Sequence, residues 1–277
     1  MEAPATAGPA VGELLARGRA RLEAAGCDTP RLDAELLLGE ALGVSRARLV
    51  LDRDENVPSA DVERFERLLL RREAREPVAY ILGRRDFRRL TLNVDRRVLI
   101  PRPETELLVE VGLELPAAAS VIDVATGSGA VALALKDERP DLSVRGTDLS
   151  PDAIEVARAN GARLGLEVEF AVADLLDGAV ADAVLANLPY VPSGEPLEPE
   201  IALYEPARAL FAGAGGLDLV RRLVGEVAGS PGVALLGLEV DPRQACEVVA
   251  LMRDAGLEEV EVRRDLAGSE RAVVGRR

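Results

Sequence analysis

The stretch Val121-Ile122-Asp123-Val124-Ala125-Thr126-Gly127-Ser128-Gly129-Ala130 decides the fold class of this chain. It joins an apolar run, typical of a buried strand, to a turn of small residues and then to the start of a helix. Gly127 and Gly129 allow the backbone of the turn to come close to a ligand at the helix N-terminus. Ala132 occupies the third place of a G-x-G-x-x-G/A pattern, which is compatible with a nucleotide-type ligand. The stretch therefore predicts the ligand-binding unit of an α/β protein.

The chain on both sides of this unit alternates between apolar strands and helical segments. The predicted strands are Ser120–Val124, Ser143–Thr147, Glu167–Ala171, Ala183–Ala186, Val233–Val240, Glu258–Val262 and Arg271–Val274. The predicted helices are Ala130–Lys136, Pro151–Leu164, Leu217–Ala228 and Pro242–Ala255. Such regular alternation is typical of a mostly parallel sheet covered by helices on both faces.

Further candidate site residues follow the next two strands. Asp148 lies about 20 residues after the glycines, where an acid can bind ribose hydroxyls. Its alternative role is to cap the helix that starts near Pro151, which Ser150 could do as well. Asp174 could reach an adenine amine, and Leu175 could pack on the adenine ring. Because these strand ends meet at one edge of the sheet, they predict a site for an adenosine-type cofactor.

The tetrapeptide Asn187-Leu188-Pro189-Tyr190 follows the apolar strand Ala183–Ala186 and is the candidate catalytic turn. Methylating a planar amide or amine nitrogen requires both of its hydrogens to be held while the nitrogen faces the methyl donor. The side-chain oxygen of Asn187 and the main-chain carbonyl of Leu188 can accept those hydrogens, and Tyr190 can pack on the planar group. Taken alone, such a tetrapeptide is more often a plain turn after a strand, so the rest of the chain must decide between the two roles.

Composition excludes several kinds of protein. The net charge of −14 argues against a surface that grips a nucleic-acid backbone, because such binding depends on Lys and Arg. The absence of histidine removes the commonest general base and metal ligand. Cys27 and Cys246 lie far apart without metal-ligand spacing, which predicts two free thiols in a cytoplasmic protein and no metal site. No apolar stretch is long enough to span a bilayer.

The first part of the chain has a helical pattern up to about residue 76. Thr29-Pro30 predicts one helix start, Ser59 predicts another, and Pro77 ends the second segment. From Asp86 to Ile100 the apolar residues follow a period of two, which predicts a hairpin. We therefore divide the chain into a helical domain (1–83), a hairpin linker (84–100) and an α/β domain (101–277).

Nearly the whole chain resembles the HemK/PrmC family, the glutamine-N5 methyltransferases that modify peptide-chain release factors. The matching stretches are Glu76–Gly83, the hairpin with Phe87, Val98–Glu106, Asp123–Ala130 and Tyr204–Phe211. The run Ile100-Pro101-Arg102-Pro103-Glu104-Thr105-Glu106 is the most specific of them. The resemblance implies a helical N-terminal domain, a linking hairpin and a Rossmann-like, seven-stranded S-adenosylmethionine-dependent methyltransferase domain whose last strand is antiparallel.

The resemblance also implies the substrate, which is the glutamine in the Gly-Gly-Gln motif of class-1 release factors. Residues 125–129 would contact the methionine part of the cofactor, Asp148 its ribose and Leu175 its adenine, while residues 187–190 would hold the glutamine amide. The candidate cofactor-binding residues are Ala125, Thr126, Gly127, Ser128, Gly129, Asp148, Asp174, Leu175 and Asn187. The candidate catalytic residues are Asn187, Leu188, Pro189 and Tyr190.

Two residues depart from the family pattern. Ala125 stands where the family usually has glycine, and Leu188 replaces the first proline of Asn-Pro-Pro-Tyr. Because Asn-Leu-Pro-Tyr also resembles the motif of ribosomal-RNA adenine dimethyltransferases, a nucleic-acid adenine N6-methyltransferase is the alternative function. A ribosomal-protein glutamine methyltransferase and a cofactor-binding scaffold without chemistry are further alternatives. We expect a cytoplasmic monomer that binds release factors, with no stable nucleic-acid or membrane binding.

Overall fold

The computed structural model describes residues 8–277, and the chain divides into two compact units. Among the described residues, one unit consists of residues 8–83 together with Leu197–Tyr204. The other consists of Arg84–Pro196 and Glu205–Arg277, so the hairpin belongs to it. Residues 197–204, which lie inside the predicted methyltransferase domain, thus fold with the N-terminal helices. The chain leaves the second unit after Pro196 and re-enters it at Glu205.

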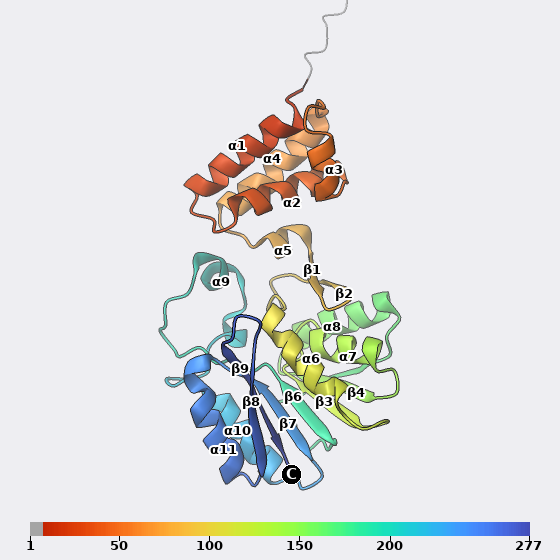
Figure 1. Ribbon diagram of the computed structural model, residues 1–277, viewed down its shortest axis with the longest axis vertical. Coiled ribbons are helices and arrows are strands. Elements are labelled where there is room, and N and C mark those ends of the chain that lie inside the picture. The colour runs from red at the N-terminus through yellow and green to blue at the C-terminus, as the bar shows by residue number, and fades with distance from the viewer. Residues whose placement is uncertain (1–7) are drawn as a thin grey trace, which may run out of the picture. The chain divides into compact units, whose positions relative to one another are not determined.

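The first unit is helical, as the sequence predicts (Figure 1). Its helices are α1 (Val11–Ala24), α2 (Pro30–Leu42), α3 (Arg46–Leu51), α4 (Ser59–Glu73), α5 (Val78–Leu82) and α9 (Pro199–Tyr204). The predicted starts at Pro30 and Ser59 are confirmed, and α4 ends before Pro77. Phe65 on α4 is fully buried and packs with leucines of α1 and α2, which gives this unit a core of its own.

The hairpin is shorter than predicted. Strand β1 (Arg84–Phe87) pairs with β2 (Leu90–Asn93) in an antiparallel ladder, whereas residues 98–100 form no strand. Phe87 and Leu90 are three residues apart, so the period of two is interrupted between them, and this is where the two-residue turn lies. The prediction that the hairpin extends to Ile100 was therefore wrong, although Val98 and Ile100 are buried.

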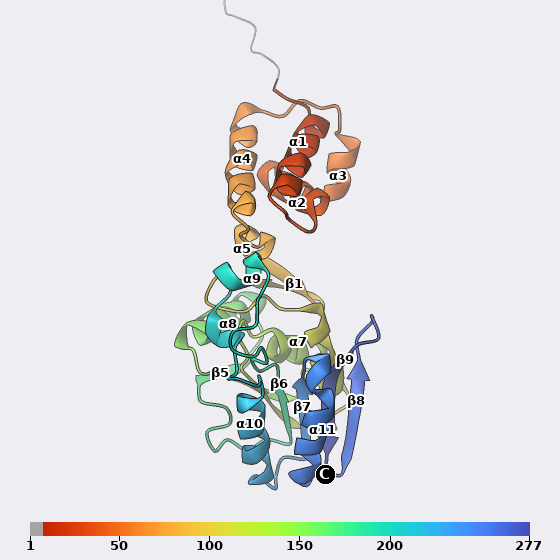
Figure 2. The same ribbon diagram turned by 90° about the vertical axis from the view of Figure 1, so that its left-hand side faces the viewer.

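The second unit contains the predicted seven-stranded sheet (Figures 1 and 2). Its strands are β3 (Ser120–Val124), β4 (Ser143–Asp148), β5 (Glu169–Val172), β6 (Ala183–Ala186), β7 (Leu235–Glu239), β8 (Glu259–Arg264) and β9 (Glu270–Arg276). They lie in the order β5-β4-β3-β6-β7-β9-β8, and β9 is antiparallel to both neighbours. The glycine turn after β3 and the tetrapeptide after β6 therefore follow two adjacent parallel strands.

Helices cover both faces of this sheet (Figures 1 and 2). They are α6 (Glu106–Leu113), α7 (Ala130–Glu138), α8 (Pro151–Leu164), α10 (Asp218–Ala228) and α11 (Ala245–Asp254). Short 3-10 helices are η1 (Pro103–Thr105), η2 (Ala207–Ala209) and η3 (Pro242–Gln244). Val121 packs with residues of α6, α7 and α8, while its neighbour Ile122 packs with residues of α10 and α11. Strand alternation thus builds two separate apolar layers.

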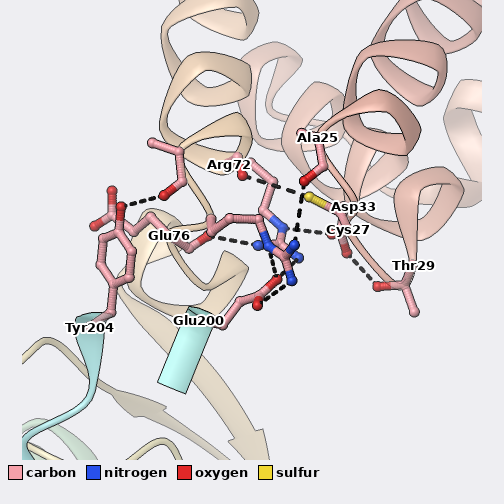
Figure 3. A network of polar contacts seen from close by, with 10 residues as sticks. Ala25, Cys27, Thr29, Asp33, Arg72, Glu76, Glu200 and Tyr204 are labelled. Atoms are coloured by element: carbon pink, nitrogen blue, oxygen red, sulfur yellow. Dashed lines mark hydrogen bonds and ion pairs between the residues drawn. The ribbon is translucent and has the colours of Figure 1, made fainter. Parts of the chain in front are cut away.

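Ion pairs and a hydrogen bond hold α9 in the helical unit (Figure 3). The carboxylate of Glu200 accepts hydrogen bonds from Arg72 Nη2 at 2.9 Å and from Arg75 Nε and Nη2 at 2.7 and 2.5 Å. The hydroxyl of Tyr204 donates to the carbonyl oxygen of Ala74 at 2.7 Å. These contacts pair charged groups on α9 with the C-terminal end of α4 and the residues after it, which explains why 197–204 folds with this unit.

Both cysteines are free, Cys27 buried and Cys246 exposed. Burial raises the pKa of the Cys27 thiol, which lowers its reactivity. Within residues 8–277, none of the helices combines the length and the apolar composition that crossing a membrane requires.

Candidate active site

A buried carboxylate holds the glycine turn between β3 and α7. Asp123 Oδ2 accepts hydrogen bonds from the Thr126 hydroxyl at 2.5 Å and from the Ala132 backbone N–H at 3.1 Å. Burial raises the pKa of Asp123 to about 7, and the two hydrogen bonds oppose that rise. Asp123 was not predicted as a site residue, although an acid inside the apolar run of β3 was a visible signal. It fixes the turn against the first turn of α7.

The two glycines of this turn have different roles. Gly127 has φ +55°, and a Cβ built on it would meet no atom within 4 Å. Gly129 has φ +83°, and its Cβ would come within 3.0 Å of Leu133 and 3.1 Å of Phe170. Gly127 therefore leaves open space beside the backbone, whereas Gly129 permits close packing of α7 on the sheet. Ala125 has φ +59°, a left-handed conformation in which glycine is the less strained residue.

Asp148 at the end of β4 contacts the same turn. Its Oδ2 accepts the Gly127 N–H at 3.0 Å, and its Oδ1 accepts the Ser150 N–H at 2.8 Å. Burial raises the pKa of the Asp148 carboxyl, and these two hydrogen bonds oppose the shift. The capping role belongs to Ser150, whose hydroxyl accepts the Ala153 N–H at 3.4 Å. Asp148 is therefore not needed as the cap of α8.

The side chain of Asn187, just after β6, is held from one side. Its Nδ2 donates to Thr105 Oγ1 at 3.0 Å, and Thr105 Oγ1 donates to Glu239 Oε2 at 2.6 Å. Thr105 and Glu239 are buried, whereas Asn187 is partly exposed. Since the amide nitrogen is engaged on the protein side, the oxygen Oδ1 is the atom of this amide that is left for a ligand.

The rest of the tetrapeptide anchors the turn. Leu188 is buried in the core layer formed with α10 and α11, and Pro189 is also buried. The carbonyl oxygen of Tyr190 accepts a hydrogen bond from Gln244 Nε2 at 3.0 Å. Burial, with the nearby Glu239 carboxylate, raises the pKa of Tyr190 to about 12, so its hydroxyl is neutral at ordinary pH.

One cleft, partly open to solvent, brings the strand ends together. The predicted site residues that line it are Ala125, Gly127, Asp148, Asp174, Leu175, Asn187, Leu188 and Pro189. Thr126, Ser128, Gly129 and Tyr190 are not among its lining residues. The Asn187 turn therefore faces the same space as the glycine turn, and the leucine is packed into the core rather than displacing the asparagine.

Two features of the cleft were not predicted from the residues that follow the strands. Asp174 is half-exposed and accepts a hydrogen bond from Arg222 Nη2 at 2.8 Å. Arg97 and Arg208 also line the cleft, and sequence reasoning did not single them out. Arg208 lies in the stretch Tyr204–Phe211, whose resemblance to the family was the available signal. Its positive charge lowers the pKa of Asp148, against the larger effect of burial.

The chain matches two family models. The model described as the PrmC N-terminal domain covers residues 13–83, and the model described as the methyltransferase small domain covers residues 103–222. The release factor glutamine methyltransferase of Rhodospirillum rubrum is 42% identical over 277 residues, which is 96% of this chain and 85% of that protein. The chain belongs to the release factor glutamine methyltransferase family. The member from Deinococcus radiodurans is also 42% identical, over 96% of this chain and 98% of its own length.

Solved structures resemble this family member in fold. A human methyltransferase 10 domain containing protein gives a TM-score of 0.52 at 13% identity and covers 67% of this chain and 87% of that chain. A methyltransferase from Pyrococcus furiosus gives 0.50 at 14% identity with the same coverage. These likenesses support the Rossmann-like methyltransferase fold.

Proposed function

We propose that this family member transfers a methyl group from S-adenosylmethionine to the side-chain nitrogen N5 of the glutamine in the Gly-Gly-Gln motif of class-1 release factors. The observation that carries the proposal is the cleft in which Asn187 and the Gly127 turn face the same space. Family membership over nearly the full length supports the choice of substrate. We expect the enzyme to act on this protein substrate in the cytoplasm, as a monomer.

The cleft has the chemical groups that fit the cofactor. The open space beside Gly127 and its positive φ allow the methionine part to approach the backbone. The carboxylate of Asp148 keeps lone pairs beyond its two backbone hydrogen bonds and could accept from ribose hydroxyls. Leu175 is apolar, buried and part of the cleft wall, and it could pack on adenine. When bound, S-adenosylmethionine supplies a methyl group on a positively charged sulfonium.

The tetrapeptide would hold the substrate amide. Asn187 Oδ1 would accept one hydrogen of the glutamine NH₂, and the main-chain carbonyl of Leu188 would accept the other. Holding both hydrogens fixes the plane of the NH₂ group, so that its nitrogen faces the methyl donor. Transfer of the methyl group would form the N–C bond and leave the cofactor as a neutral thioether, and the amide nitrogen would then lose one proton to solvent. No side chain needs to remove that proton first, which suits a chain without histidine.

The decisive experiment is incubation with labelled S-adenosylmethionine, a class-1 release factor and ribosomal particles, followed by peptide mapping of the label. We expect the label on the glutamine of Gly-Gly-Gln. Label on ribosomal-RNA adenine would favour the nucleic-acid adenine methyltransferase. Label on a glutamine of a ribosomal protein would identify that protein as the substrate instead. Cofactor binding without label on any of them would indicate a scaffold.

Asp148→Asn should weaken S-adenosylmethionine binding by about tenfold, because an amide is a poorer acceptor for ribose hydroxyls than a carboxylate and holds the Gly127 turn less firmly. Isothermal titration calorimetry measures the effect directly. Asp152→Asn is the matched control, since Asp152 is exposed on the first turn of α8 and does not line the cleft. Equal affinity of the two variants would contradict the assignment of Asp148 to the cofactor.

A further inference from the structure

The hydrogen-bonded chain behind Asn187 joins residues from three separate elements. Asn187 follows β6, Thr105 ends η1, and Glu239 ends β7. Thr105 is 5% exposed and Glu239 is 3% exposed, so the chain runs from the edge of the cleft into the protein. The distances of 3.0 Å and 2.6 Å are those of ordinary and strong hydrogen bonds. Neither Thr105 nor Glu239 lines the cleft.

The charge of Glu239 determines the direction of every hydrogen bond in this chain. An ionised carboxylate can only accept, so the hydroxyl of Thr105 must donate to Glu239. The oxygen of Thr105 is then free to accept, and Asn187 must present its NH₂ to it. In this arrangement Asn187 Oδ1 is turned to the cleft as an acceptor, which the substrate NH₂ requires.

Protonation of Glu239 permits the opposite direction. A protonated carboxyl can donate to the oxygen of Thr105, and the Thr105 hydroxyl can then donate toward Asn187. An amide that accepts from Thr105 has rotated by half a turn and presents its NH₂ to the cleft. Two donor groups would then face each other, because the substrate group is also an NH₂. The three side chains thus have one productive and one unproductive arrangement, which differ in their protons and in the exchange of the Asn187 amide oxygen and nitrogen.

We infer that Thr105 and Glu239 are positioning residues, which select the Asn187 amide orientation with its oxygen toward the substrate. The inference rests on the proposed function, because it is that function which makes the substrate group an NH₂. Neither residue touches the reacting atoms, because each acts through Asn187. The pair therefore controls how often the catalytic amide is correctly oriented rather than how tightly the cofactor binds.

The surroundings of Glu239 place its titration near neutral pH. Burial raises its pKa to about 7, opposed by the hydrogen bond from Thr105 and by the positive charges of Arg271 and Arg102, while Glu104 raises it further. Tyr190 stays neutral, because its own pKa is raised to about 12. The pKa of Glu239 lies above its ordinary value, so the ionised form, which enforces the productive arrangement, becomes dominant as pH rises through about 7. The rate at saturating substrate should rise over the same range.

Thr105→Val tests the middle of the chain, because it removes the hydroxyl at nearly constant volume. We expect kcat for release-factor methylation to fall about tenfold or more, by analogy with loss of one oriented hydrogen-bonding group, with KM changed less. Thr105→Ser keeps the hydroxyl and should retain kcat within about threefold. Unchanged S-adenosylmethionine affinity and far-ultraviolet circular dichroism would establish that both variants are folded. Equal kcat in wild type and Thr105→Val would overturn the inference.

Glu239→Gln tests the end of the chain through the pH profile. Glutamine fills the same space but does not titrate, so the rise in kcat near pH 7 should disappear, leaving a lower and flat rate between about pH 6 and 8. Asp123 also has a pKa raised to about 7 by burial, and it touches the glycine turn. If the rise persists at the same pH in Glu239→Gln, a group such as Asp123 causes it, and the assigned role of Glu239 is wrong.

A measurement without turnover separates this inference from the proposed function. The sequence contains four asparagines, so selective ¹⁵N-asparagine labelling gives few side-chain NH₂ signals, and Asn187→Ala identifies the relevant pair. In the wild type, the Asn187 NH₂ should exchange slowly with solvent above pH 7, and Thr105→Val should abolish that protection. If the Asn187 NH₂ is protected from exchange but no release factor is methylated, the proposed function is wrong and the inferred orientation of the Asn187 amide stands. If release factor is methylated but the Asn187 NH₂ exchanges fast in the wild type and in Thr105→Val alike, only the inferred orientation is wrong.

Discussion

Asn187→Ala should lower kcat for methylation of the release-factor glutamine by about a hundredfold to a thousandfold, the range measured for removal of one oriented group at a reacting centre. The variant removes the acceptor for one substrate hydrogen and leaves the other hydrogen to the Leu188 carbonyl alone. The substrate NH₂ can then rotate, and the nitrogen faces the methyl donor only part of the time. Initial rates with labelled S-adenosylmethionine at saturating release factor give this comparison.

The control for this variant is Asn56→Ala, because Asn56 is exposed and belongs to the helical unit. It should retain the parent rate. Asn187→Ala should bind S-adenosylmethionine within about tenfold of the parent affinity, since Gly127 and Asp148 supply the other proposed contacts. A rate within a few-fold of the parent would show that Asn187 does not hold the substrate. A complete loss of cofactor binding would instead assign it to the cofactor site.

The sequence was sufficient to predict the sheet because its signals are local. The run from Val121 to Ala130 contains a strand, its turn and a helix start, and the strands that follow repeat the same pattern. Parallel strands place their carboxyl ends at one edge of the sheet, so the sequence alone predicts that Asp148 and Asn187 belong to one site. Their shared cleft agrees with that expectation.

The features that sequence reasoning missed depend on distant residues. Thr105 and Glu239 are 134 positions apart, and neither position alone indicates a hydrogen bond to Asn187. In the sequence, Glu200 lies between two stretches of the second unit. Its partners Arg72 and Arg75 are more than a hundred positions earlier. Periodicity and turn residues report on neighbours along the chain, so ion pairs of this span cannot be read from them.

Arg72→Met should destabilise the helical unit by about 3–5 kcal/mol, the usual cost of breaking a buried ion pair from one side. The guanidinium of Arg72 donates to Asp33 Oδ2 at 2.7 Å and to Glu200 Oε1 at 2.9 Å, and the Arg72 and Asp33 side chains are 6% and 5% exposed (Figure 3). After the substitution, Asp33 keeps the Thr29 hydroxyl at 2.8 Å but loses the positive charge of Arg72. Glu200 keeps Arg75 and is affected less.

Hydrogen-exchange mass spectrometry on the full chain measures this effect locally. A loss of about 3 kcal/mol should accelerate exchange of α2 and α4 amides roughly a hundredfold, since 1.4 kcal/mol corresponds to about a factor of ten. Arg17→Met is the matched control, because Arg17 is half-exposed and pairs with Glu66 at the surface, where loss of a pair costs at most about 1 kcal/mol. Similar exchange in the two variants would mean that the pair of Arg72 with Asp33 is effectively solvated.

Asp33→Asn combined with Arg72→Met should restore part of the stability, because the double variant no longer buries an unpaired charge.

Hydrogen exchange of the α9 amides tests a different point, namely which arginine holds Glu200. If Arg72 and Arg75 share the work of holding Glu200, Arg72→Met should accelerate exchange of residues 199–204 less than exchange of α2. Adding Arg75→Met should accelerate exchange of α9 further, with the hydrogen bond from Tyr204 to the Ala74 carbonyl still in place. Exchange of α9 that is unchanged in both variants would show that this segment is held by the chain on either side rather than by its ion pairs.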